Sequence, residues 1–236
     1  MQYFYNPDLN DASASFFFDK EESRHIVRVM RKNAGDFVFV TNGKGDVFRC
    51  RISNASDNKC MVEIESSEKS EKPSYNLHLA VAPTKLNDRY EWFLEKATEI
   101  GISEITPLIC QRSERQTVKT ERFHKIIQSA MKQSLQGFLP KLNEPTTFKQ
   151  FMKLNPEGMK YIAHCEETER RSLKQVLKPS SDAIILIGPE GDFTNKEIQA
   201  ALDNNFMPVS LGTTRLRTET AAIVACHTAA LINQPE

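Results

Sequence analysis

The chain has 236 residues, of which 39% are hydrophobic and 26% are charged, and its formal net charge is zero. No run approaches the roughly 18 consecutive apolar residues of a membrane-spanning helix, and the N-terminus lacks the basic and apolar regions of a signal peptide. We therefore expect a cytoplasmic protein with no membrane partner. The zero net charge also argues against binding nucleic acid through bulk charge alone.

The cysteines indicate neither a disulfide framework nor a metal site. They are Cys50, Cys60, Cys110, Cys165 and Cys226. They are scattered, odd in number and form no C-x-x-C pair, whereas metal ligation needs clustered thiolates or imidazoles. We expect reduced, mostly buried thiols and no bound metal.

Short β-type runs dominate residues 1–72. Strands are predicted over residues 37–40, 47–52 and 60–64. The Asn42-Gly43 pair between the first two runs predicts a hairpin turn. Residues 65–74 are polar and charged, which is typical of a linker. We expect a first domain, residues 1–72, built as a small antiparallel barrel or sheet.

A basic segment lies within this first domain. Arg24, Arg28 and Arg31 recur at helical spacing, so they can share one face of a helix. The face is either merely solvated or a contact surface for phosphates.

Strands and helices alternate from residue 73 to residue 236. Strands are predicted over residues 77–82, 105–109, 161–164, 183–187 and 209–211, and helices over residues 88–100, 121–136, 172–177, 195–204 and 218–231. Asp88 with Glu91 predicts a cap at the start of the first helix, and Gly101 predicts its end. The alternation indicates an α/β domain with a largely parallel sheet and helices on both faces.

Two glycine loops in this second domain are candidate ligand-binding elements. The first, Gly188-Pro189-Glu190-Gly191-Asp192, follows a buried strand and precedes a capping box formed by Thr194 and Glu197. It lacks the Lys-Ser/Thr of a phosphate-binding P-loop, and Glu190 would repel an anion. The loop is either a tight turn without a ligand or a site for hydroxyls, amines or positive charge.

The second loop, residues 211–220, carries two arginines into an apolar helix. Thr218 is the predicted helix cap, and Glu219 lies in the first turn. Arg215 and Arg217 need partners if they are buried, so either Arg217 pairs internally with Glu219 or Glu190, or the arginines serve a function. Ligands of open α/β sheets bind outside the carboxyl ends of the strands, which favours one site built from both loops.

Six motifs can be read together, and the last two of them are distinctive. The six are His25-Ile26-Val27-Arg28-Val29-Met30-Arg31, Lys96-Ala97-Thr98-Glu99-Ile100-Gly101, Arg112-Ser113-Glu114, Lys132-Gln133-Ser134, Ile187-Gly188-Pro189-Glu190-Gly191 and Leu216-Arg217-Thr218-Glu219-Thr220-Ala221. Over nearly its whole length the chain resembles the uridine N3-methyltransferases of small-subunit ribosomal RNA, the RsmE family of the SPOUT class. Two departures stand out: Thr213-Thr214-Arg215 replaces the usual proline, arginine and aliphatic residue, and Asp192 replaces a common glycine.

The resemblance implies a fold and an activity. The fold would be a SPOUT methyltransferase domain with a C-terminal trefoil knot, preceded by a PUA-like RNA-binding β-barrel. The activity would be methylation of N3 of a uridine in 16S ribosomal RNA, with S-adenosylmethionine as cofactor, within an assembled or assembling small subunit. A homodimer is implied. The alternatives are a methyltransferase of the same fold acting on another base or a ribose 2′-oxygen, and a non-catalytic RNA- or nucleotide-binding protein.

Roles for single residues follow from the resemblance. Arg217, or Arg215 in its place, would stabilise the negative charge of deprotonated uracil. Glu219 or Glu190 could accept the N3 proton or only orient the arginine. The expected cofactor-binding residues are Leu186, Ile187, Gly188, Glu190, Gly191, Leu211, Gly212, Leu216 and Thr220. The expected RNA-binding residues are Arg24, Arg28, Arg31, Arg112 and Arg115. His25 and His164 are expected to be packed or hydrogen-bonded rather than catalytic.

Overall fold

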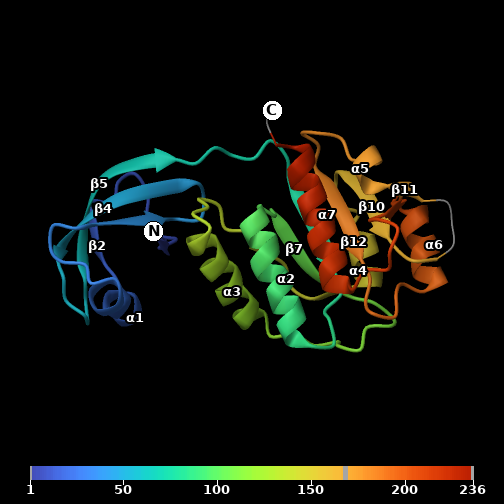
Figure 1. The fold of residues 1–236 in the computed structure, drawn as a ribbon, viewed down its shortest axis with the longest axis horizontal. Coiled ribbons are helices and arrows are strands. Elements are labelled where there is room, and N and C mark those ends of the chain that lie inside the picture. Colours follow the sequence, from blue (N-terminus) through green and yellow to red (C-terminus); the bar gives the residue numbers. More distant parts are fainter. Residues whose placement is uncertain (1, 167–169, 235–236) are drawn as a thin grey trace. The chain divides into compact units, whose positions relative to one another are not determined.

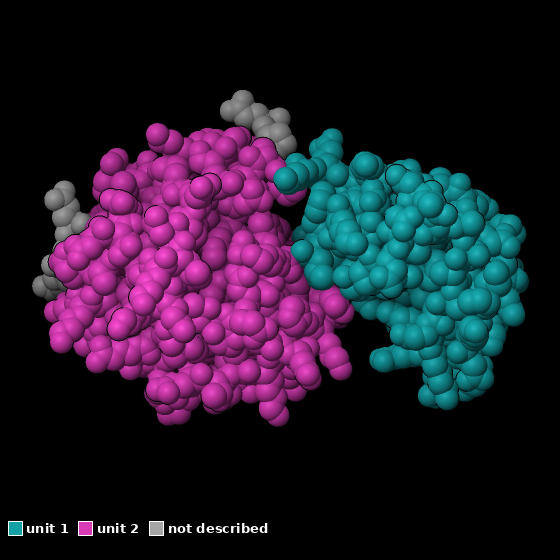
Figure 2. Space-filling view, turned by 180° about the vertical axis from the view of Figure 1, so that it is seen from behind, with its two compact units in different colours: residues 1–72, 131–139 teal, residues 73–130, 140–236 magenta. Residues whose placement is uncertain are grey.

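The computed structural model describes residues 2–166 and 170–234. The chain folds into two compact units, residues 1–72 with 131–139 and residues 73–130 with 140–236, which are coloured separately in Figure 2. Assignment of residues 131–139 to the first unit was not foreseen from the sequence. None of the helices in the described part has the length and apolar character that crossing a membrane requires.

The first unit contains a half-barrel sheet with the strand order β1-β3-β4-β5-β2. The strands are β1 Tyr3–Tyr5, β2 Ser15–Phe17, β3 Phe37–Thr41, β4 Asp46–Asn54 and β5 Met61–Lys69. The predicted hairpin turn is confirmed, since Gly43 has a φ of 71° between β3 and β4. The linker was predicted to begin at residue 65, which is too early. Strand β5 continues to Lys69 because it pairs with the full length of β4, ending at Asp46.

Residues 131–139 pack against the turn between β3 and β4. The Thr41 hydroxyl donates to the Gly137 carbonyl (3.0 Å), and the Leu139 amide donates to the Gly43 carbonyl (2.9 Å). A Cβ on Gly45 would lie 2.5 Å from the Phe138 ring, so only glycine permits this approach. The segment begins with the last turn of α3 (Thr120–Gln133), a helix that ends before its predicted end at residue 136.

The basic segment is not a simple α-helix. Helix α1 (Lys20–Arg24) continues as a π-helix, η1 (His25–Val29), and Arg31 beyond it has a φ of 56°. The i→i+5 bonding of a π-helix changes the angular spacing of its side chains. Arg24, Arg28 and Arg31 therefore do not form the predicted α-helical face. Arg28 pairs with Asp57 at the surface.

The second unit confirms the predicted α/β class (Figure 1). Its sheet has the order β11-β13-β10-β12-β6-β7-β8, with β9 also beside β7, and every pairing is parallel. The strands are β6 Leu77–Val81, β7 Glu104–Ile109, β8 Lys141–Leu142, β9 Thr146–Thr147, β10 Met159–Ala163, β11 Arg171–Ser172, β12 Ala183–Ile187 and β13 Met207–Ser210. The helices other than α3 are α2 Asn87–Ile100, α4 Phe148–Leu154, α5 Leu173–Val176, α6 Asn195–Asp203 and α7 Thr218–Ile232.

Helices cover both faces of this sheet. Side chains alternate along a strand, and Ile184 and Leu186 of β12 pack in one core with α4 and α6. Helices α2 and α7 lie side by side on the sheet (Figure 1), and α7 contacts both β6 and β12. All five residues of β12 are buried, as its uninterrupted apolar run predicts.

The helix ends test the capping predictions. Gly101 ends α2 with a φ of 107°, and the capping box of Thr194 and Glu197 starts α6, both as predicted. The predicted caps of α2 and α7 are wrong. Helix α2 begins after Leu86 without a side-chain cap, and α7 begins after Arg217. Thr218 instead donates its hydroxyl hydrogen to the Gly188 carbonyl (3.0 Å), which joins the two glycine loops.

Candidate cofactor and active site

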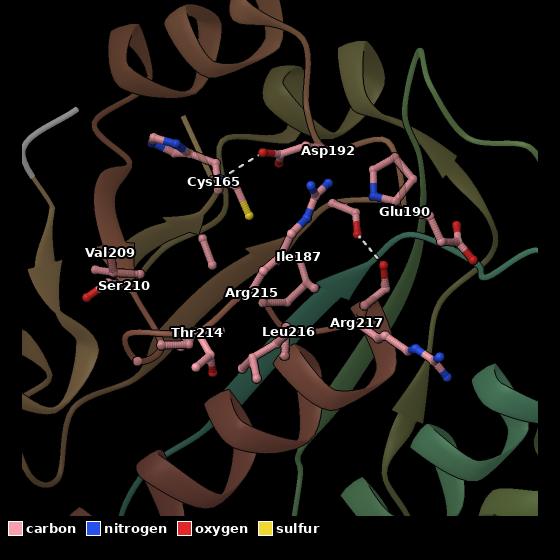
Figure 3. A pocket seen from close by; sticks show the side chains of 18 of the residues that line it. Cys165, Ile187, Glu190, Asp192, Val209, Ser210, Thr214, Arg215, Leu216 and Arg217 are labelled. Carbon is pink, nitrogen blue, oxygen red and sulfur yellow. Dashed lines mark hydrogen bonds between the residues drawn. The ribbon is translucent and has the colours of Figure 1, made fainter. Parts of the chain in front are cut away.

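A cavity of about 390 Å³ lies at the carboxyl ends of β10, β12 and β13 (Figure 3). Strand β10 pairs with β12 on one side and with β13 on the other. The two glycine loops therefore follow strands that are not neighbours in the sheet. The end of β10 lies between them and forms a third wall.

No pattern in the sequence predicted this third wall of the cavity. It consists of Ala163, His164, Cys165 and Arg170. The predicted strand over residues 161–164 is followed by no glycine, so it carried no signal of a ligand loop. Only the strand order brings it to the site.

Most of the predicted cofactor residues reach the cavity. Those that line it are Ile187, Gly188, Glu190, Leu211, Gly212 and Leu216. Leu186 is fully buried in the core under α4 and α6. Gly191 packs against Arg112, where an added Cβ would lie 3.3 Å from the Arg112 Cβ. Thr220 is not among the lining residues.

Asp192 shapes the loop after β12. Its φ of 61° is a left-handed conformation that glycine adopts without cost. The carboxylate accepts hydrogen bonds from the amides of Cys165 (2.7 Å) and Phe193 (2.8 Å). Asp192 thus ties the end of β10 to the loop after β12 (Figure 3).

The two candidate carboxylates have different environments. Glu190 is exposed, lines the cavity and accepts a hydrogen bond from the Lys85 amide (2.9 Å). Glu219 is only 8% exposed and lies 3.7 Å from Arg89 of α2. Its second oxygen is buried and has no partner among the described residues. Glu219 does not line the cavity.

Arg215 and Arg217 both line the cavity and are exposed. Neither guanidinium forms an ion pair with any residue that the structure describes, so the alternative of an internal pair with Glu219 or Glu190 is not realised. In Figure 3 the Arg215 side chain extends toward Asp192, whereas that of Arg217 points the other way. The site therefore presents two cations that are available to a ligand.

Arg112 and Arg115 bind backbone carbonyls. Arg112 donates to Gly191 (2.9 Å) and Arg115 donates to Lys85 (2.9 Å). Together with the bond from Lys85 to Glu190, these contacts connect the loops that follow β6, β7 and β12. In this structure both guanidinium groups hold the loops around the cavity.

The two histidines are packed or hydrogen-bonded, as predicted. In the first unit, His25 Nε2 lies 2.9 Å from the side-chain nitrogen of Gln2. In the second unit, His164 is 5% exposed and lines the cavity. Burial, and then the charge of Arg170, lowers the pKa of His164, which favours the neutral imidazole.

The cavity suits a ligand with both apolar and polar parts. Ile187, Val209, Leu216 and Ala221 provide apolar surface, and Glu190 and Asp192 provide negative charge. Gly212, with a φ of 142°, has nothing within 4 Å of a hypothetical Cβ, so its backbone is open to a ligand. S-adenosylmethionine, which combines adenosine, a sulfonium and an amino acid, fits this set of groups.

Comparisons with known proteins agree with this geometry. Residues 70–230 match the family model of the RNA methyltransferase domain, and residues 18–65 match that of the RNA methyltransferase PUA domain. The ribosomal RNA small subunit methyltransferase E of Rickettsia conorii is 32% identical over 204 residues, which cover 85% of this chain and 83% of that relative.

Solved structures share the fold. A probable rRNA-methyltransferase from Porphyromonas gingivalis is 38% identical with a TM-score of 0.92, over 99% of this chain and 98% of that one. The ribosomal RNA small subunit methyltransferase E of Neisseria gonorrhoeae, bound to S-adenosyl methionine, is 25% identical with a TM-score of 0.89, over 99% and 98% of the two chains.

The fold and the cavity define an S-adenosylmethionine-dependent RNA methyltransferase with a PUA-like N-terminal unit. Within that class, the chain belongs to the ribosomal RNA small subunit methyltransferase E family.

Proposed function

We propose that this protein transfers a methyl group from S-adenosylmethionine to N3 of a uridine in 16S ribosomal RNA. The observation that carries the proposal is the cavity at the ends of β10, β12 and β13, which presents Arg215 and Arg217 without ion-pair partners among the residues that the structure describes. Membership of the family sets the chemistry, and the two arginines fit it.

The reaction requires the uracil imide to lose its N3 proton. Bound S-adenosylmethionine supplies a methyl group on a positively charged sulfur. Deprotonated uracil carries negative charge on its carbonyl oxygens, and a guanidinium beside them stabilises that charge as the bond forms. We assign this role to Arg217, because its side chain points away from the part of the cavity that Arg215 enters (Figure 3). Arg215 would then face the cofactor.

Glu190 is the better candidate for the proton acceptor. It lines the cavity and is exposed, whereas Glu219 is buried beside Arg89. A general base must come within hydrogen-bonding reach of the proton, directly or through one water. We assign Glu219 the role of fixing the first turn of α7, which positions Arg217.

We propose a ligand for the cavity and another for the basic segment of the first domain. The cofactor would contact Ile187, Gly188, Leu211, Gly212 and Leu216, largely through their backbone. In the first domain, residues 1–72, we propose that Arg24, Arg28 and Arg31 contact RNA phosphates, which position a bound RNA. Residues 73–236 would form the catalytic domain.

We further propose a trefoil knot at the C-terminus. After β12 the chain forms β13 on the far side of β10, and α7 then returns to pack on β6 and β12. The hydrogen bond from Thr218 to Gly188 brings the returning chain against the loop after β12. This path supports a knotted connection.

A homodimer is also part of the proposal. Trp92 of α2 is 45% exposed and Leu231 of α7 is 50% exposed, on two helices that pack together. We propose that a partner subunit covers these exposed side chains. Analytical ultracentrifugation should give the mass of a dimer. A monomer mass at micromolar protein concentration would contradict the proposed homodimer. We propose that the enzyme acts in the cytoplasm, on ribosomal RNA.

The function is tested by mapping modified nucleosides in ribosomal RNA from a strain lacking this protein. N3-methyluridine should disappear from the small-subunit RNA and return when the gene is restored. Persistence of N3-methyluridine, with loss of a ribose-methylated or other base-methylated nucleoside, would favour the alternative methyltransferase activity.

A further inference from the structure

His164 is a buried histidine whose hydrogen-bonding groups are unused. Its ring is 5% exposed, and neither Nδ1 nor Nε2 has a partner within the described residues. The same residue lines the cavity at the end of β10. Buried polar side-chain atoms are nearly always hydrogen-bonded in native proteins, so this exception needs an explanation.

The backbone around His164 is held from both sides. The His164 carbonyl accepts a hydrogen bond from the Arg170 guanidinium, and the next amide, that of Cys165, donates to Asp192 (2.7 Å). These contacts fix the chain that carries the ring, while the ring itself gains no polar contact. The arrangement is preorganised for a partner that the described residues do not supply.

The chemistry of the ring limits what that partner can be. A neutral imidazole offers one N–H donor and one acceptor nitrogen. In S-adenosylmethionine, the sulfonium offers neither, the ammonium only donates and the carboxylate only accepts. In the adenosine moiety, each ribose hydroxyl both donates and accepts at a single oxygen, and the adenine amino donor lies directly beside accepting ring nitrogens.

We propose that the His164 imidazole hydrogen-bonds the adenosine moiety of S-adenosylmethionine and so sets cofactor affinity. The inference rests on the proposed function and adds a side-chain contact to a cofactor site otherwise described by backbone groups. His164 acts as a binding residue and takes no part in the methyl transfer.

The first test is a ligand series with the full-length protein. We expect His164→Leu to weaken binding of S-adenosylmethionine, S-adenosylhomocysteine and 5′-methylthioadenosine by the same factor, about 3- to 10-fold for one lost hydrogen bond. His164→Asn or His164→Gln, whose amides can replace one ring nitrogen, should recover part of the affinity. Unchanged binding in His164→Leu, or a loss confined to the two ligands with an amino-acid moiety, would overturn the proposal.

The second test uses stability. Removing a buried polar group without a partner should leave the thermal midpoint of the ligand-free protein unchanged or raised, while the increase in midpoint on adding S-adenosylmethionine should shrink. His78→Leu is the matched control. His78 is hydrogen-bonded to Thr106 (2.7 Å) and does not line the cavity, so its loss should lower the midpoint and leave affinity unchanged.

The two tests separate this proposal from the proposed function. If the wild-type protein binds S-adenosylmethionine and the His164 variants bind it equally well, only the histidine contact fails. If the wild-type protein does not bind the cofactor at all, the proposed function fails first. A lowered midpoint of ligand-free His164→Leu with unchanged affinity would assign the ring to packing alone.

Discussion

Asp192 shows how one residue can serve both the backbone and the site. Its left-handed φ of 61° costs a side-chain-bearing residue free energy, which its hydrogen bonds to the amides of Cys165 and Phe193 offset. The sequence already marked this position as a departure from a common glycine. The structure gives the reason: glycine adopts the conformation, and aspartate adopts it while also binding the end of β10.

Asp192→Ala should therefore destabilise the protein by about 1–3 kcal/mol, because it keeps the backbone strain and loses two hydrogen bonds. Asp192→Gly should cost less, since it relieves the strain. Denaturant unfolding measures both. Asn205→Ala, at another non-glycine residue of positive φ, is the control and should leave cofactor affinity unchanged, whereas Asp192→Ala should weaken it. Equal stability of the alanine and glycine variants would contradict the strain argument.

Arg217 and Arg215 should separate kinetically. Arg217→Ala should reduce kcat by roughly 100-fold or more, the scale of losing one preorganised charge-stabilising donor, with little change in cofactor affinity. Arg215→Ala should instead affect cofactor binding, because its side chain enters the cavity beside Asp192. Steady-state kinetics and calorimetry resolve the two effects. The assignment of the two arginines is reversed if Arg217→Ala weakens cofactor binding and Arg215→Ala lowers only kcat.

At the level of elements, some local signals predicted helix ends correctly and others did not, whereas the order of the strands could not be predicted from local signals at all. Gly101 and the box of Thr194 with Glu197 mark helix ends through contacts within a few residues, and both predictions hold. The insertion of β10 between β12 and β13 depends on pairing between distant segments. No local pattern encodes that pairing, so the third wall of the cavity and the position of His164 could not be foreseen.

The basic segment illustrates a different limit. Its composition predicts a cationic surface, but the π-helix and the left-handed Arg31 decide where each arginine lies. Such π-turns are frequent at functional sites. Arg28 is 60% exposed and is partly neutralised by Asp57. If Arg28 binds phosphate, Asp57 competes with the RNA for the Arg28 guanidinium.

RNA binding at several salt concentrations tests this competition. Arg28→Ala combined with Arg31→Ala should weaken binding and reduce the salt dependence of the affinity by roughly one to two units of slope. Asp57→Asn should strengthen binding, because it releases Arg28. Arg51→Ala is the control, since Arg51 is paired with Glu63 and Glu65 on the sheet of the same unit. An unchanged slope in the double variant would remove this segment from the RNA-binding surface.

At the scale of the molecule, the sequence separated a β-rich part from an α/β part, and the described residues form two units of these kinds. What escaped prediction is that residues 131–139, which begin with the last turn of α3, belong to the first unit although the rest of that helix belongs to the second. Phe138 and Gly137 are placed by the glycine turn after β3. That contact joins segments separated in sequence by 96 positions, which no periodicity can reveal.

The central claim is that this molecule methylates N3 of a uridine in the small ribosomal subunit. The most direct measurement incubates the purified protein with methyl-labelled S-adenosylmethionine and small subunits from a strain that lacks it, followed by nucleoside mass spectrometry. We predict labelled N3-methyluridine from the wild-type protein and almost none from Arg217→Ala. Label on a ribose oxygen or on another base, or no transfer by a protein that binds the cofactor, would contradict the account.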